Sequence, residues 1–197
     1  MCGIIGIISK QDINVLSYLL NGLKQLQNRG YDSAGISIID NGNFLTKKFA
    51  STNSCNSLQK LENEMLDVSE NKYCNIGMGH TRWATHGGKT DNNSHPHISY
   101  DNNVILVHNG VIENYNELKK ELMDKGIEFK SQTDTEVIVN MIAYYYKTRP
   151  FDKAIGDTMN RLEGTWGLVI ICVDTPNKLY CIRKGSPLLI SNNEDYV

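Results

Sequence analysis

Apolar residues along the chain occur in two arrangements: short continuous runs, and stripes spaced three or four residues apart. Short runs bounded by polar residues are typical of buried strands, whereas spaced stripes are typical of helices that cover a sheet. The runs predict strands over residues 2–9, 34–40, 44–50, 75–80, 104–108, 166–173 and 179–183, and the start of another at 188–190. The stripes predict helices from residue 12 to about 26 and over 57–68, 114–125, 133–145 and 152–162.

Turn and cap residues mark several of these boundaries. The sequence NGN at 41–43 separates two strand patterns and predicts a hairpin. Asp12 is a plausible N-cap for the first helix, Asn114 and Glu117 can cap the third reciprocally, and TDTE at 133–136 forms a capping box before the fourth. The strands come as hairpins and pairs and do not alternate regularly with helices. The pattern therefore favours an α+β fold of antiparallel layers over a doubly wound parallel sheet.

Composition narrows the class of protein and its partners. The chain has 197 residues, 40% of them hydrophobic and 21% charged, with a formal net charge of -2. These values are typical of a globular domain and exclude disordered and fibrous classes. Because 20 basic residues face 22 acidic ones, no excess positive charge is available for a phosphate backbone or an anionic membrane. Neither nucleic acid nor a membrane is therefore expected as a partner.

The cysteines and the start of the sequence indicate a cytoplasmic protein. Five cysteines are an odd number, and no pair has CxxC spacing, which favours free thiols in a reducing compartment. The apolar start MCGIIGIIS lacks a preceding basic region and is too short for a signal peptide.

Cys2 is the first candidate for chemistry because of its position. Removal of Met1 would leave the Cys2 thiol and a free α-amine on one residue. The thiolate is the reactive form of cysteine, and an α-amine with a reference pKa of about 7.7–8.0 can accept its proton. Nucleophile and base would then share one residue, as in N-terminal nucleophiles. An ordinary buried cysteine is the alternative interpretation, and it is the better one if Cys2 is considered alone.

Polar residues near strand and helix ends are candidates for binding groups. Arg82 offers a planar charged fork for a carboxylate, although a solvated surface arginine is the commoner case. Asn109 and Gly110 can offer two donors to one oxyanion, although Asn-Gly after a strand is also a common turn. Asp134 could receive an ammonium group, or it could simply stabilise the first turn of a helix.

The histidines invite a metal interpretation that the sequence does not favour. His80, His86, His95 and His97 fall within one stretch, but no HExxH motif is present and no acid or thiol cluster completes a zinc shell. Hydrogen bonding within the loop is the favoured role for these side chains.

Taken together, these segments resemble the class II glutamine amidotransferase domain. Within that class they are most similar to the glutaminase domain of the glutamine–fructose-6-phosphate aminotransferases. The matching segments occur in the family's order from residue 1 to about 190: MCGIIGII, RGYDSAGI, GHTRWATHG, NSHPH, VHNGVIENY, SQTDTEVI, LEGTWGLVII and RKGSPLLI. The resemblance implies an N-terminal-nucleophile hydrolase fold, an αββα sandwich with two antiparallel sheets between helical layers. It implies no cofactor and no metal.

The resemblance also implies a substrate and a role for each matching residue. Cys2 corresponds to the nucleophile that hydrolyses the amide of L-glutamine through a thioester, and Asn109 and Gly110 correspond to the oxyanion hole. The remaining matches are Arg82 for the glutamine carboxylate, Asp134 for its ammonium, Trp83, Thr85 and His86 for a loop over glutamine, Arg29 near the nucleophile, and His95 near a sugar site. A glutamine-binding regulatory or interaction module without turnover is the alternative function.

The sequence departs from the family's pattern at two places. Gly88-Lys89-Thr90 stands where the family usually has a proline, which predicts a more mobile loop. The 197 residues also end before the family's last strands, and nothing in them matches the sugar isomerase domain. We therefore expect one glutaminase domain over residues 1–197. Fructose 6-phosphate would be engaged only through an isomerase domain, and a homodimer is possible in the full-length enzyme.

Overall fold

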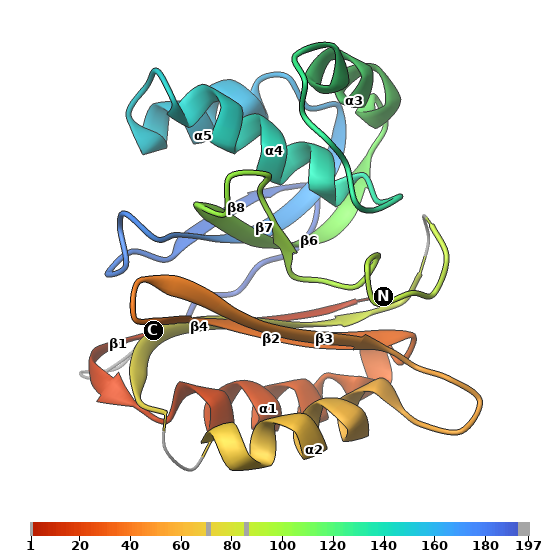
Figure 1. Ribbon diagram of the computed structural model, residues 1–197, viewed down its shortest axis with the longest axis vertical. Coiled ribbons are helices and arrows are strands. Elements are labelled where there is room, and N and C mark those ends of the chain that lie inside the picture. Colours follow the sequence, from red (N-terminus) through yellow and green to blue (C-terminus); the bar gives the residue numbers. More distant parts are fainter. Residues whose placement is uncertain (1, 70–71, 85–86, 193–197) are drawn as a thin grey trace.

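The computed structural model describes residues 2–69, 72–84 and 87–192. Two four-stranded antiparallel sheets lie face to face, and a layer of helices covers the outer face of each (Figure 1). This arrangement confirms the predicted α+β sandwich of two antiparallel sheets between helical layers.

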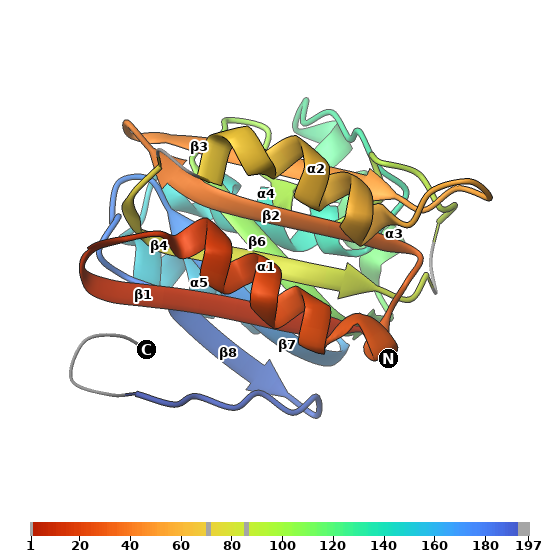
Figure 2. The ribbon, with the colours of Figure 1, turned by 90° about the horizontal axis from the view of Figure 1, so that it is seen from below.

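The first sheet carries the N-terminal half of the chain. Its strands β1 (Gly3–Ile13), β2 (Ser33–Asp40), β3 (Asn43–Ala50) and β4 (Cys74–Arg82) pair in the order β1-β4-β2-β3. Helices α1 (Val15–Gln25) and α2 (Ser57–Ser69) lie across its outer face (Figure 2), and the short 3-10 helix η1 (Gln27–Arg29) follows α1. The end of β4 lies between the starts of β1 and β2, because Thr81 pairs with Gly3 and Arg82 pairs with Ser33.

The second sheet carries the remaining strands. Its order is β5 (His97–Ile98), β6 (Val104–Ile112), β7 (Gly164–Cys172) and β8 (Tyr180–Lys184). Helices α3 (Tyr115–Asp124), α4 (Thr135–Tyr146) and α5 (Phe151–Met159) form the layer on its outer side (Figure 1).

Alternating burial explains why the central strands have continuous apolar sequences. In β6, Ile105 and Val107 pack between the two sheets, while Val104 and Leu106 pack under α4 and α5. Because successive side chains of a strand point to opposite faces, a strand covered on both sides must be apolar at every position. The same arrangement holds in β7, where Val169 and Ile171 face the other sheet and Leu168 and Ile170 face the helices.

The predicted hairpin is present, and its turn residues explain it. Asn41 and Gly42 both have positive φ, 49° and 75°, between β2 and β3. A two-residue turn with positive φ at both positions matches the twist of paired strands and favours Asn-Gly.

Two predicted helix caps are wrong: one residue lies inside a strand, and the side chain of the other binds elsewhere. Asp12 lies within β1, and α1 is instead capped by Asn14, whose Oδ1 accepts a hydrogen bond from Ser17 N at 3.0 Å. Asn114 stands at the start of α3 without capping it. Its Nδ2 donates to Arg161 O at 2.9 Å and its Oδ1 accepts from Glu163 N at 3.1 Å.

The capping box predicted at 133–136 is also wrong. The fourth helix begins at Thr135, and Asp134 precedes it without a side-chain cap. The Glu136 carboxylate accepts hydrogen bonds from Lys130 N at 2.8 Å and Ser131 N at 2.6 Å. The Glu136 side chain therefore anchors the backbone that precedes the helix, and the Asp134 side chain accepts a hydrogen bond from Ile112 N on β6.

The strand predicted at 188–190 is absent, since residues 185–192 are neither helical nor in a strand. Leu188 packs into the core between the sheets, but Leu189 is 96% exposed.

In the part of the chain that the structure describes, no helix is long and apolar enough to cross a membrane.

Candidate active site

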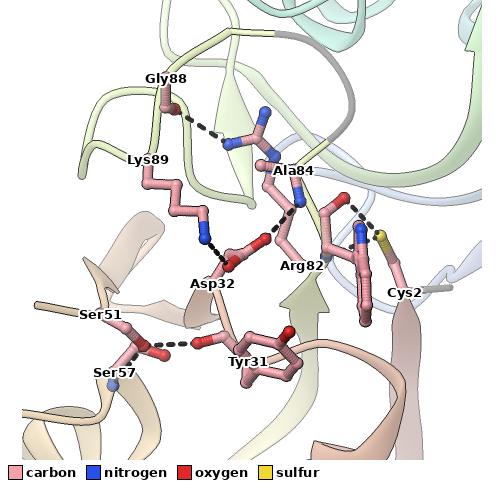
Figure 3. A network of polar contacts seen from close by, with 10 residues as sticks. Cys2, Tyr31, Asp32, Ser51, Ser57, Arg82, Ala84, Gly88 and Lys89 are labelled. Carbon is pink, nitrogen blue, oxygen red and sulfur yellow. Dashed lines mark hydrogen bonds and ion pairs between the residues drawn. The ribbon is translucent and has the colours of Figure 1, made fainter. Parts of the chain in front are cut away.

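The Cys2 thiol lies where β1 meets the end of β4. Its Sγ accepts a hydrogen bond from Trp83 N at 3.1 Å and lies 3.5 Å from Trp83 O (Figure 3). Burial raises the pKa of this thiol, although the Trp83 N–H and nearby positive charge oppose the change. The thiol therefore needs a base to become a nucleophile at neutral pH.

Asn109 and Gly110 reach Cys2 from the opposite sheet. The Asn109 side-chain amide, on β6, donates through Nδ2 to the Cys2 carbonyl oxygen at 3.1 Å. Gly110 follows with φ of 145°, in a region that side chains rarely adopt. A Cβ at this position would lie 2.0 Å from Thr165 O. Close packing of β6 on β7 therefore explains the glycine, and Asn109-Gly110 lies within a strand and not in a turn.

Arg82 and Asp134 place opposite charges beside the thiol. Arg82 ends β4 with only 4% of its surface exposed, and its Nη1 donates to Gly88 O at 3.3 Å. Burial lowers the Arg82 pKa, while Cys2, Asp32 and Asp134 act in the opposite direction. Asp134 is 6% exposed, and its Oδ2 accepts from Ile112 N at 2.8 Å. The backbone of β6 thus fixes the carboxylate on the same side as the guanidinium.

These side chains border one small cavity of about 30 Å³. The residues that line it are Cys2, Arg82, Trp83, His95, His108, Gly110, Thr133, Asp134 and Thr135. Six of the ten residues expected at the site line it, and Asn109 borders it through its bond to Cys2. A cavity of this size holds roughly one water molecule, so an amino acid needs the surrounding segments to move apart.

The other three expected residues lie apart from this cavity or outside the description. Arg29 is exposed on η1 and does not line the cavity. Thr85 and His86 lie outside the described residues.

Asp32 is a residue that sequence reasoning missed. Its carboxylate accepts from Ala84 N at 2.8 Å and pairs with Lys89 Nζ at 2.5 Å, so it holds segments before and after residues 85–86 (Figure 3). Burial alone would raise the Asp32 pKa, but the Lys89 contact and the Ala84 N–H outweigh it and lower the pKa. The available signal was an acidic residue just before a buried strand, within the RGYD segment.

Lys48 also escaped prediction, and it supports the loop that carries His95. Its Nζ donates to Ser94 O at 2.7 Å and Pro96 O at 3.0 Å. Burial lowers the Lys48 pKa to about 8. His95, held between these two carbonyls, bonds through Nε2 to Thr135 Oγ1 at 3.0 Å.

Three buried histidines pack their imidazole rings against one another. The imidazoles of His80 and His95 are stacked with centroids 4.2 Å apart, and His97 meets His95 edge-on at 4.8 Å. Burial lowers the pKa of all three, that of His80 to about 3. Within the described ranges, no group of three His, Cys, Asp or Glu side chains could hold a metal ion.

A larger groove of about 480 Å³ lies elsewhere, along β1 and residues 188–192. Its walls are mostly aliphatic, and the one thiol there, Cys181, has a pKa raised by burial. Among the described residues that line this groove, we find neither a base nor an activated nucleophile, so it is a weaker candidate for catalysis than the cavity at Cys2. The smaller cavity at Cys2 is therefore the candidate active site, despite its size.

Comparison of the sequence with known proteins points to one family. A family model described as a glutamine amidotransferase domain matches residues 80–195. A glutamine–fructose-6-phosphate aminotransferase [isomerizing] of Clostridium perfringens is 43% identical over 195 residues, and the alignment covers 98% of this chain and 30% of that protein. The protein of the same name from Pyrococcus horikoshii is 44% identical over 191 residues, with 96% and 30% covered. The chain thus spans about a third of the length of these relatives.

Solved structures share the fold at lower sequence identity. A glutamine phosphoribosylpyrophosphate amidotransferase from B. subtilis superposes with a TM-score of 0.67 at 24% identity, covering 88% of this chain and 35% of that one. A structure titled as the allosteric regulatory enzyme of purine biosynthesis gives a TM-score of 0.70 at 24% identity, with 87% and 35% covered. These likenesses support the N-terminal-nucleophile sandwich as the fold.

Proposed function

The chain belongs to the glutamine amidotransferase domain family, and on that premise we propose that it hydrolyses the side-chain amide of L-glutamine to glutamate and ammonia. The observation that carries the proposal is the Cys2 thiol, set between a two-residue donor group and a pair of opposite charges. A free amino acid carries a carboxylate and an ammonium, which Arg82 and Asp134 complement.

The nucleophile in this proposal is the Cys2 thiol, and its base is the α-amine of the same residue after loss of Met1. The amine takes the thiol proton as sulfur attacks the amide carbon. The C–N bond then breaks, and the ammonium returns the proton to the leaving nitrogen, which departs as ammonia. A thioester remains. Water, deprotonated by the same amine, attacks it, the C–S bond breaks, and glutamate and the thiol are released.

The oxyanion formed in both steps would be stabilised by Asn109 Nδ2 and the Gly110 N–H. Both groups lie on β6, a central strand, so their positions are fixed before the reaction begins. Donors held in place cost little reorganisation as charge develops on the carbonyl oxygen.

The remaining residues would bind and enclose the substrate. Arg82 would bind the glutamine carboxylate through its guanidinium fork, and Asp134 would bind the ammonium. We assign the loop over glutamine to Trp83, Thr85 and His86. Arg29 and His95 would support the site from its margin.

We further propose that residues 1–197 form the glutaminase part of a glutamine–fructose-6-phosphate aminotransferase. The relatives that carry this name support it, and each is about three times as long as the chain. Ammonia would then pass to fructose 6-phosphate in an isomerase domain, within a homodimer in the full-length enzyme, in the cytoplasm.

The test combines intact mass with a turnover assay. Mass spectrometry establishes whether Met1 is removed, and glutamate and ammonia are measured with glutamine as the substrate. Cys2→Ala should abolish both products, whereas the matched control Cys55→Ala, in a loop outside the cavity, should retain them. Glutamine binding without turnover by a chain with a free Cys2 amine would favour the regulatory module instead.

A further inference from the structure

His80 connects the two sheets directly beneath Asn109. It lies on β4 with 1% of its surface exposed, and its Nε2 reaches across to β6. Two oxygens of β6 lie within hydrogen-bond distance of this nitrogen: Asn109 Oδ1 at 2.9 Å and the His108 carbonyl at 3.2 Å.

These two contacts determine where the imidazole proton sits. A carbonyl oxygen can only accept a hydrogen bond, so Nε2 must carry the proton to avoid facing the His108 oxygen with its own lone pair. Burial keeps the ring neutral by lowering its pKa to about 3, so the ring has a single N–H. Nδ1 is then the unprotonated nitrogen, and it is buried without a hydrogen-bond partner among the described residues.

The tautomer in turn determines the orientation of the Asn109 amide. An Nε2–H group attracts the amide oxygen and repels the amide NH2, so Oδ1 faces His80 and Nδ2 faces Cys2. The stack on His95, with 28° between the ring planes, holds the imidazole at the required angle. A rotated amide would present an oxygen to the developing oxyanion and repel it.

We infer that His80 is a positioning residue of the active site: it orients the Asn109 side-chain amide so that the NH2 group faces the nucleophile. The inference rests on the proposed function, because an amide oriented toward Cys2 matters only if negative charge develops there. His80 itself touches neither the thiol nor the cavity wall.

The test is a double-substitution cycle on the chain with a free Cys2 amine. His80→Leu should lower kcat by about ten- to hundredfold, below the limit of about a thousandfold for complete loss of an oxyanion donor. KM for glutamine should stay the same, because the oxyanion exists only in the transition state. His80→Gln should recover most of the loss, since its amide can donate from a position near that of Nε2.

The second arm of the cycle separates positioning from general damage. In an Asn109→Ala background, His80→Leu should change kcat by less than about twofold, because no amide remains to be oriented. An undiminished effect in that background would overturn the inference. His97→Leu is the matched control, since His97 is equally buried in the stack but bonds to Thr133 Oγ1 instead of Asn109. It should lower the melting temperature while kcat falls far less than in His80→Leu.

Imidazole ¹⁵N spectra of the resting protein give a readout that does not depend on turnover. The His80 spectrum should show a protonated Nε2 and a bare Nδ1 throughout the neutral pH range. Turnover together with the opposite tautomer would overturn the inference and leave the proposed function standing. Absence of turnover in the wild-type chain with a free Cys2 amine would overturn the proposed function, and the catalytic purpose of His80 with it.

Discussion

Gly110 is the position where one added methyl group should damage both the fold and the chemistry. Its Cβ would lie 2.0 Å from Thr165 O and 2.7 Å from Thr165 C, both backbone atoms of the neighbouring strand. Backbone atoms in a central sheet cannot move aside as a flexible side chain can, so β6 and β7 must separate locally. The φ of 145° adds strain for any residue with a Cβ.

The expected magnitude follows from these two costs. An unfavourable backbone region costs about 1–3 kcal/mol and overpacking about 1–3 kcal/mol, so Gly110→Ala should lower the free energy of unfolding by about 2–6 kcal/mol. A shifted strand also withdraws the Gly110 N–H from the oxyanion. Loss of one such donor corresponds to a fall of about 10²–10³ in kcat.

Gly126→Ala is the control for this prediction. Gly126 follows α3 with φ of 82°, but nothing lies within 4 Å of its added Cβ. This variant should lose only about 1–2 kcal/mol through its backbone and keep its kcat. Urea unfolding measures the stabilities, and glutamate release is measured at a temperature where both variants are folded. Wild-type kcat in folded Gly110→Ala would refute the assignment of its N–H to the oxyanion hole.

Three further outcomes are expected. In the chain from which Met1 has been removed, kcat/KM should fall on the acid side of its pH profile near the reference α-amine pKa of about 7.7–8.0. In a chain that retains Met1, any residual activity should rise only as the pH approaches the raised pKa of the Cys2 thiol. Identical pH profiles for the chains with and without Met1 would exclude the amine as the base. Arg82→Ala and Asp134→Asn should each raise KM for glutamine and lower kcat/KM about ten- to hundredfold, since a charge-assisted hydrogen bond contributes about 1.5–3 kcal/mol. An unchanged KM in both would remove these residues from the site. Lys89→Ala should lower stability to an extent that depends on pH. Because the pKa of Asp32 is lowered in the folded protein, the stabilisation from this carboxylate is present above the ordinary carboxyl pKa and is lost as pH falls through the folded-state pKa. Without Lys89 that loss should begin at higher pH. The drop in melting temperature should shrink at high salt, because Lys89 is more than half exposed, and a salt-independent drop would argue against the ion pair.

The sequence by itself determined the local elements of this protein. Among the described residues, apolar runs and stripes located every β-strand of four or more residues and all five α-helices, because a buried face imposes its period on the residues that form it. The Asn-Gly turn of the first hairpin followed in the same way from backbone conformations that few other residues adopt. The motifs also supplied the candidate residues of the proposed site, since a thiol, an amide donor or a charge is a property of the residue type.

Tertiary structure alone decided which polar side chains serve which partners. The caps predicted at Asn114 and Glu136 failed because both side chains bind backbone groups that another element or loop brings near. Those backbone groups would otherwise be left without a hydrogen-bond partner, which costs free energy. The apolar residues at 188–190 lie beside the edge strand β1 without forming a strand, although Leu188 still packs into the core between the sheets. A polar side chain has several possible partners within reach, and local sequence does not rank them.

The site shows the same division between residue type and placement. Cys2 meets Trp83 across 81 positions and Asn109 across 107, through pairing of β1 with β4 and stacking of the two sheets. The contacts of Asp32 with Ala84 and Lys89, and of His80 with the amide of Asn109, likewise arise only in this arrangement. The sequence specifies what each group can donate or accept, whereas distance and direction follow from how the sheets pack.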